Sequence, residues 1–292
     1  MATLRDIKLR IKGVKSTQQI TKAMKMVAAA KLRRATESVL NARPYAKKIS
    51  VLLSSLVNED EKQANPLFAD REVNNVAVVV VTADRGLCGA FNTNIIKEAV
   101  RYLEEEVNQK GLNYQLYCLG KKGSDYFGRR NYNLAAAYPG IFSHINYTIA
   151  QKLVDEIIPK YLDGSIDKVI IIFNEFKSII QQKIVVEQFL PIASGTENEN
   201  DKQESVYYIY EPDQKAIFEY LIPKHLKGQM WRVLLESNAS EFAARMTAMD
   251  NATTNAKELI RTLSLTYNSK RQAAITTEIL EIVSGANALK EN

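Results

Sequence analysis

The sequence predicts a long antiparallel coiled coil with an open α/β sheet domain inserted between its two helices. Apolar residues recur at helical spacing near both ends of the 292-residue chain. Between these ends, short β-branched runs alternate with helical patterns, which is typical of a sheet covered by helices on both faces. We expect an N-terminal helix over residues 1–57 and the α/β domain over 74–205. A foot segment and the C-terminal helix are expected over 206–292.

The N-terminal helix is predicted from apolar spacing and from the scarcity of helix breakers. At 1.5 Å per residue, 57 helical residues span about 85 Å, and a helix of that length needs a partner for its apolar face. Pro44 removes one helical hydrogen bond, so the helix is expected to bend or divide there. The residues expected to form the buried stripe are Leu4, Ile7, Ile11, Val14, Ile20, Met24 and Val27.

The C-terminal helix is predicted from a heptad pattern, in which apolar or small residues alternate steps of four and three. After Tyr267 the steps become four, four and four through Ile279, which locally unwinds a left-handed supercoil. The predicted heptad positions are Phe242, Met246, Met249, Thr253, Ala256, Ile260, Leu263 and Tyr267.

The segment "NSKRQAAITTEILEI" follows this change of spacing. On a helical wheel at about 100° per residue, its isoleucines share one face, which we expect to meet the N-terminal helix. Polar residues line the two edges of that face and are predicted to point outward, toward another protein. These residues are Arg271 and Glu278 on one edge, and Gln272 and Thr276 on the other.

The central segment predicts four strands, over 74–81, 113–120, 131–138 and 167–176, and an added antiparallel strand within 178–192. Helices are expected over about 94–108, over 121–130 and over 143–164. The polar, turn-rich stretch 193–205 predicts a loop that leaves the domain. The tyrosine-rich stretch 206–213 is compatible with a closing strand and with an exposed docking patch.

The turn "TADRGLCGAF", Thr82 to Phe91, lies where an α/β protein would bind a nucleotide. It has neither of the two common phosphate-binding spacings of glycine, so Gly86 and Gly89 are interpreted as residues of a tight turn, and Cys88 as a small packed residue. Two cysteines and two histidines at scattered positions predict no metal site and no disulfide framework. The shortage of histidine argues against general acid–base catalysis but does not exclude an enzyme that uses carboxylates.

The net charge of +6 is unevenly distributed. Residues 1–57 hold thirteen Lys and Arg against Asp6 and Glu37, an excess of eleven positive charges, so the rest of the chain is mildly acidic. This asymmetry favours an acidic protein partner. Two alternatives remain, a coiled-coil nucleic-acid-binding protein and a nucleotide-using α/β enzyme. No apolar run reaches the length of a membrane span, and the basic N-terminus is interpreted as mature helix.

Three stretches together resemble the gamma subunit of F-type ATP synthases over essentially the whole chain. They are "IKLRIKGVKSTQQITKAMKMVAAAKLRRA", "DRGLCGAFN" and the C-terminal stretch that contains "ARMTAMDNATTNAKELI" and "RQAAITTEI". The family usually has a serine at or next to Ala83, which is a difference confined to the turn. No cysteine follows Cys118, so the thiol control of photosynthetic members is not expected.

The resemblance implies a non-catalytic rotor shaft that couples proton flow through a membrane ring to ATP synthesis or hydrolysis in a hexameric head. The implied partners are the alpha and beta subunits of the head, the epsilon subunit and the c-ring, with one shaft per complex, no cofactor and no nucleic acid. A peripheral position on the cytoplasmic face of the bacterial inner membrane is implied too. The implied head contacts are Met24, Arg245, Arg271, Gln272, Thr276 and Glu278, and the implied foot contacts are Tyr208 and Glu211.

Overall fold

The computed structural model describes residues 3–56, 65–69, 71–179, 181–192, 211 and 213–290, and it describes no side chains for 54, 55 and 287–290. The chain divides into two compact units. The first contains Met1–Ala28 and Met246–Asn292, and the second contains Ala29–Arg245. Two helices contribute to both units, α1 (Leu4–Leu56) and α6 (Gln214–Lys290).

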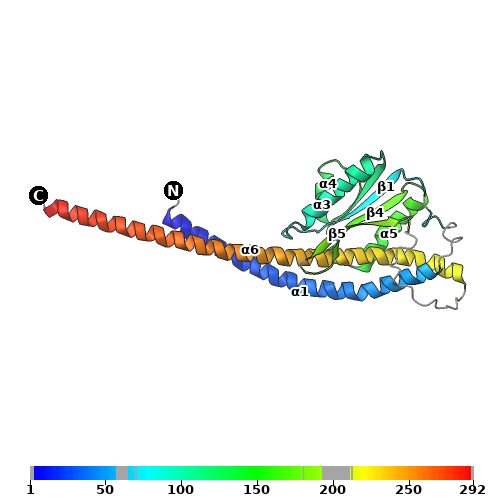
Figure 1. Ribbon diagram of the computed structural model, residues 1–292, viewed down its shortest axis with the longest axis horizontal. Helices are drawn as coiled ribbons and strands as arrows, with labels where there is room; N and C mark the ends of the chain where they lie inside the picture. The colour runs from blue at the N-terminus through cyan, green and yellow to red at the C-terminus, as the bar shows by residue number, and fades with distance from the viewer. Residues whose placement is uncertain are drawn as a thin grey trace. The chain divides into compact units, whose positions relative to one another are not determined.

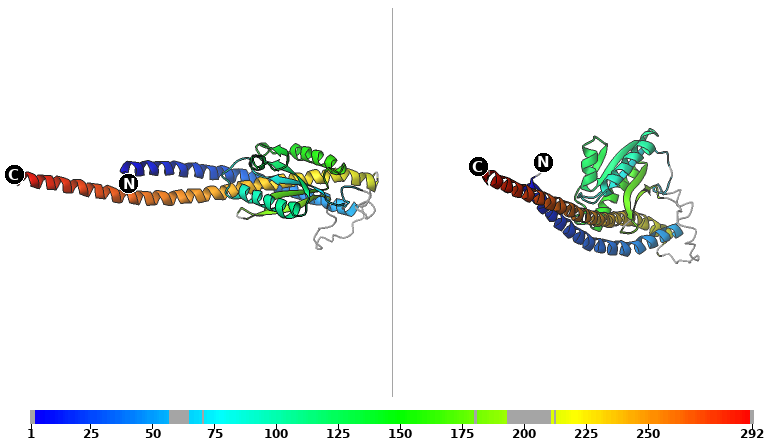
Figure 2. Two further views of the ribbon diagram at one scale, coloured as in Figure 1. Left: turned by 90° about the horizontal axis from the view of Figure 1, so that it is seen from above. Right: turned by 60° about the vertical axis from the view of Figure 1, so that its left-hand side comes forward.

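In the first unit, α1 and α6 run antiparallel along each other (Figures 1 and 2). The Thr253 hydroxyl donates to the Thr21 hydroxyl oxygen at 2.8 Å, and Lys25 pairs with Asp250 at 2.6 Å. On α6 the predicted heptad is confirmed, because its positions from Met246 to Tyr267 are buried or half-buried while most residues between them are exposed.

The predicted stripe of α1 is correct at its start and wrong further along. Leu4, Ile7, Ile11 and Val14 are buried or half-buried, but Ile20 is 59% exposed and Val27 is 57% exposed. The buried positions keep alternating steps of three and four, so the stripe continues through smaller and more polar side chains. Those side chains are Gln18, Thr21, Lys25 and Ala28.

The second unit is built on a five-stranded sheet with the order β3-β2-β1-β4-β5. The strands β1 (Asn75–Val81), β2 (Asn113–Leu119), β3 (Leu134–Tyr138) and β4 (Lys168–Phe176) are parallel, and β5 (Gln182–Leu190) pairs antiparallel with β4. The predicted strands and the antiparallel addition are thus confirmed.

Helices cover both faces of this sheet, as predicted (Figure 1). Val76, Val78 and Val80 of β1 pack with helix α3 (Phe91–Tyr102), its π-helical continuation η1 (Leu103–Asn108) and helix α4 (Lys121–Gly128). The alternate β1 residues face helix α5 (Tyr147–Leu162) and the parts of α1 and α6 that belong to this unit. Such alternation follows from the two-residue period of a strand.

Pro44 does not divide α1, which continues from Leu4 to Leu56. A long partner helix compensates for one lost hydrogen bond.

The first sheet helix begins at Phe91, three residues before the expected Asn94. The loop expected over 193–205 and most of the segment 206–213, Tyr208 included, lie outside the described residues. Glu211 is described and exposed, and the Asp213 carboxylate accepts the Ala216 N–H at 2.8 Å in the first turn of α6.

Candidate functional site

The C-terminal part of α6 in the first unit continues beyond the residues that pair with α1. Thr21 meets Thr253 and Lys25 meets Asp250, so in antiparallel helices of equal rise the start of α1 at Leu4 lies opposite about residue 270. Lys270 and Ala274 are the last half-buried positions. The described residues of α6 from Arg271 onward therefore extend past the described start of α1.

The isoleucine face predicted to meet α1 is exposed. Ile275 is 47% exposed, Ile279 54% and Ile282 71%. The prediction was wrong because the wheel gives the direction of a side chain but not whether the partner helix extends that far. An apolar helix face of this kind needs cover from another protein, since contiguous exposed apolar patches mark interaction sites.

The four polar residues of this segment are exposed, as expected of groups that point outward. The Thr276 hydroxyl donates to the Gln272 carbonyl at 2.9 Å, one helical turn back. No ion pair joins Arg271 to Glu278 in the part of the chain that the structure describes. Their charged groups are thus available to a partner.

A second exposed apolar set lies on α1 of the same unit. Ile20, Met26 and Val27 are each more than half exposed, although sequence reasoning placed Ile20 and Val27 in the buried stripe. Strict extension of the heptad from Leu4 would have identified them as outward-facing. Met24 is half-buried beside Lys25, whose ammonium is held by Asp250.

Arg245 lies in the second unit and is largely enclosed, with 12% of its side chain exposed. Its guanidinium donates to the Glu241 carboxylate at 2.5 Å and to the Gly86 carbonyl at 2.6 Å. Burial raises the pKa of Glu241, and the adjacent Arg245 opposes that shift. Arg245 thus fixes α6 to the glycine turn of the sheet domain.

That turn presents Leu87 to solvent at 67% exposure, with a positive φ of 65°. Gly89 also has positive φ, 59°, which agrees with its predicted use in a tight turn. Cys88 is buried, and burial raises the pKa of its thiol. A raised thiol pKa disfavours the reactive thiolate, so Cys88 is a packed residue, as predicted.

The place where a phosphate would bind in an open α/β sheet holds an internal carboxylate. Asp84 follows β1 and accepts backbone N–H groups from Lys121 at 2.9 Å, from Gly140 at 2.7 Å and from Phe142 at 2.9 Å. Lys121 is the first residue of α4, and a helix N-terminus attracts an anion. Asp84 supplies that anion itself, which agrees with the structural interpretation of the turn.

The described residues contain neither a metal-binding cluster nor a membrane-spanning helix. Among the described residues, no group of three or more His, Cys, Asp and Glu side chains could hold a metal ion. None of the described helices combines the length and the apolarity needed to cross a bilayer.

The fold and the exposed helix end define the class of protein: a coiled-coil protein with an inserted α/β domain and an exposed apolar face at the end of its C-terminal helix. A model of the ATP synthase family matches residues 3–289. The chain belongs to the gamma-chain family of ATP synthase, whose members are rotor subunits of the central stalk.

Individual relatives agree with this assignment. The chain is 54% identical to the ATP synthase gamma chain of Chloroherpeton thalassium and 54% identical to that of Chlorobaculum tepidum, and each alignment covers 100% of both chains. Among solved structures, it is similar to a chain of the central stalk and c-ring of the Tetrahymena thermophila mitochondrial ATP synthase. That match has a TM-score of 0.61 and 28% identity, and it covers 80% of this chain and 99% of that one.

A more distant structure shares the fold alone. It is a chain of the Euglena gracilis mitochondrial ATP synthase rotor, with a TM-score of 0.66 and 21% identity over 93% of this chain and 98% of that one.

Proposed function

We propose that this chain is the non-catalytic shaft that couples proton flow through a membrane ring to catalysis in a hexameric head of alpha and beta subunits. One copy serves each complex. The observation that carries the proposal is the end of α6, where Ile275, Ile279 and Ile282 are exposed beyond the start of α1. A head that surrounds this helix end would cover its exposed apolar face.

Apolar contacts suit a part that turns. Burying the exposed remainder of one isoleucine contributes on the order of 1 kcal/mol, and the attraction has no preferred direction. The helix can therefore stay covered at every angle while it rotates.

The polar residues give the shaft its preferred angles. Arg271, Gln272, Thr276 and Glu278 are the proposed head contacts, and each charge-assisted hydrogen bond contributes about 1.5–3 kcal/mol where it forms. Because these bonds must break during each turn, moderate strength spread over four residues is more useful than one strong bond.

Two further head contacts are proposed, Met24 and Arg245. Met24 would contribute from its half-buried position on α1. Arg245 would act through the turn that it holds, since its guanidinium is bonded to Glu241 and to the Gly86 carbonyl. The surface offered to the head is then the exposed Leu87 and its neighbours.

The contacts with the epsilon subunit and the c-ring are proposed to be made by Tyr208 and Glu211. The complex would lie peripherally on the cytoplasmic face of a bacterial inner membrane. The shaft would bind neither cofactor nor nucleic acid. The 54% identity to bacterial gamma chains over their full length supports these assignments.

The experiment that tests the proposal is Gln272→Ala combined with Thr276→Ala in the assembled complex. Multi-site ATP hydrolysis should slow or assembly should weaken, and the circular dichroism of the purified chain should be unchanged. Thr266→Ala is the matched control, because Thr266 makes the same hydroxyl-to-carbonyl contact, to Thr262 at 3.0 Å, inside the paired region. Wild-type turnover together with a melted coiled coil in the double variant would show that these residues pack rather than bind.

A further inference from the structure

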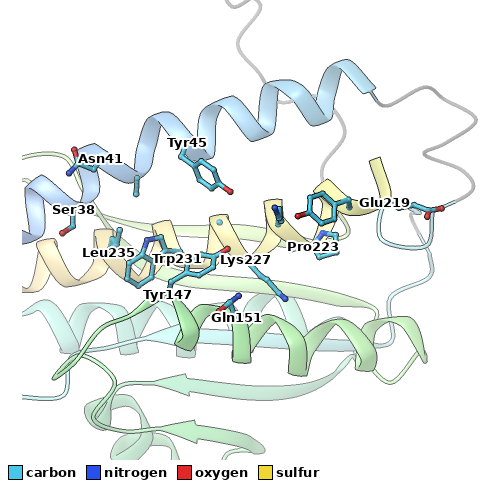
Figure 3. Close-up of a pocket in the computed structure, with 14 residues that line it drawn as sticks. Ser38, Asn41, Tyr45, Tyr147, Gln151, Glu219, Pro223, Lys227, Trp231 and Leu235 are labelled. Atoms are coloured by element: carbon cyan, nitrogen blue, oxygen red, sulfur yellow. The ribbon is translucent and has the colours of Figure 1, made fainter. Parts of the chain in front are cut away.

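A groove with a volume of about 860 Å³ lies in the second unit, with walls from α1, α5 and α6 (Figure 3). We call it the aromatic groove because four aromatic side chains line it. Ser38 and Asn41 of α1 and Gln151 of α5 add polar groups to the same lining. The residues that define it are Tyr45, Tyr147, Tyr220, Lys224, Gly228 and Trp231.

The aromatic side chains offer flat surfaces with polar tips. Tyr147 and Trp231 meet edge to face, with ring centroids 6.0 Å apart and an interplanar angle of 86°. Tyr45 is 53% exposed and Tyr220 is 64% exposed. Half-exposed tyrosine and tryptophan side chains are enriched where proteins bind other chains.

Gly228 leaves the floor of the groove open. It lies inside α6 and is buried, yet an added Cβ would meet no atom within 4 Å. Glycine inside a helix costs about 1 kcal/mol relative to alanine, and here no close packing requires it. Its absent side chain lets an occupant approach the helix backbone.

Pro223 adds an apolar ring to the same groove. It lies inside α6 and is one of the lining residues.

Two lysines, Lys224 and Lys227, and one carboxylate carry the charge of the lining. Lys224 lies over the Tyr220 ring at 4.1 Å from its centroid, and Lys227 pairs with Asp155 at 2.7 Å on the rim. Glu219 is the one carboxylate among the lining residues. Lys224 in particular can pair with a carboxylate of an occupant.

The aromatic lining favours an extended chain. From Glu219 to Leu235 the helix α6 advances about 24 Å. An extended peptide of about seven residues spans the same length, and aromatic-lined grooves recognise extended, proline-containing segments.

We propose that the aromatic groove binds an extended, acidic, proline-containing segment of a partner protein. The segment would stack its prolines on Tyr147 and Trp231 and place a carboxylate at Lys224. Its backbone would pass over Gly228. The proposal does not depend on the rotor function.

The test uses the full chain and its sole tryptophan, Trp231, as the reporter. A peptide of alternating Glu and Pro, about eight residues long, is titrated while tryptophan fluorescence is recorded. We expect a saturable change in the micromolar range, a much weaker response to the matching Lys and Pro peptide, and no response to an acidic helix-forming peptide.

Two variants make the test specific to the groove. Gly228→Leu fills the floor while improving helix propensity, and should weaken binding at least about tenfold. Gly285→Leu makes the same change in the same helix outside the groove, and should bind like the wild type. The proposal would be overturned if Gly228→Leu bound the Glu and Pro peptide as tightly as the wild type does, or if the Lys and Pro peptide bound equally well. It would also be overturned if the helix-forming peptide were preferred, or if no saturable change in fluorescence were seen.

Discussion

At the scale of single residues, a few polar groups determine how the sheet domain is organised. Asp84 illustrates this, because one carboxylate accepts three N–H groups from the segments that follow β2 and β3. A hydrogen bond to a charged group contributes about 1.5–3 kcal/mol. Loss of the carboxylate also leaves the partly buried N–H of Phe142 without this partner.

Asp84→Ala should therefore lower the free energy of unfolding of the sheet domain by about 2–4 kcal/mol. The measurement is urea unfolding followed by the fluorescence of Trp231. Glu72→Ala, which removes an exposed carboxylate, is the control and should leave the urea concentration at the midpoint of unfolding unchanged. A transition of Asp84→Ala that matches the control would contradict the anchoring role.

His225 makes a prediction about pH. It is 5% exposed, and burial together with the nearby Arg232 lowers its pKa from 6.5 to about 4. The unfolded chain therefore binds a proton at a higher pH than the folded chain. Above about pH 6.5 the histidine is neutral in both states and does not oppose folding. The free energy of unfolding then falls as the pH decreases toward 4.

The expected loss due to His225 is about 1.4 kcal/mol per pH unit between pH 6 and pH 4. His225→Gln should remove this part of the dependence of the free energy of unfolding on pH, as measured by urea unfolding at a series of pH values. His144 is exposed, so His144→Gln should keep the slope of the wild type. If both variants kept it, His225 would titrate alike in the folded and unfolded chains.

At the scale of elements, the heptad seam explains why two long helices are stable together. Alternating steps of three and four keep the buried positions on one side of each helix. The position within the seam matters more than the apolar character of a residue. Met249 occupies a seam position and is 5% exposed, whereas Met26 lies outside the seam and is 61% exposed.

Met249→Ala should destabilise the first unit by about 2–5 kcal/mol, because it removes a buried side chain and leaves a cavity. Met26→Ala should change the stability by less than about 0.5 kcal/mol. Thermal unfolding monitored by circular dichroism at the helical band compares the two variants. Equal effects would mean that the seam has been misplaced.

At the scale of the whole molecule, the distribution of charge separates the rotor from a nucleic-acid-binding protein. The excess of eleven positive charges in residues 1–57 would attract any polyanion at low salt. An acidic protein surface adds shape and apolar contacts that DNA lacks. Affinity for the two kinds of partner should therefore respond differently to salt.

We expect weak DNA binding by the purified chain to disappear at about 0.15 M salt, whereas the chain stays bound to its catalytic head. Fluorescence anisotropy with a labelled duplex and sedimentation of the assembled complex provide the two measurements. Tight DNA binding at that salt concentration would favour the nucleic-acid alternative.

The sequence by itself determined the elements and much of their pairing. The β-branched runs predicted the strands, and the spacing from Met246 to Tyr267 predicted the seam of α6. The outward direction of Arg271, Gln272, Thr276 and Glu278 was also predictable, because helical periodicity fixes directions locally. The same periodicity, applied strictly from Leu4, would have placed Ile20 and Val27 outside the seam.

Only the tertiary structure decided where the paired region ends. The register of Thr21 with Thr253 places the start of α1 opposite about residue 270, which leaves Ile275 exposed. It also brought the segments that follow β2 and β3 to Asp84, and it assembled the aromatic groove from α1, α5 and α6. The physical reason is that periodicity is a local property, whereas contacts between distant segments depend on register and packing.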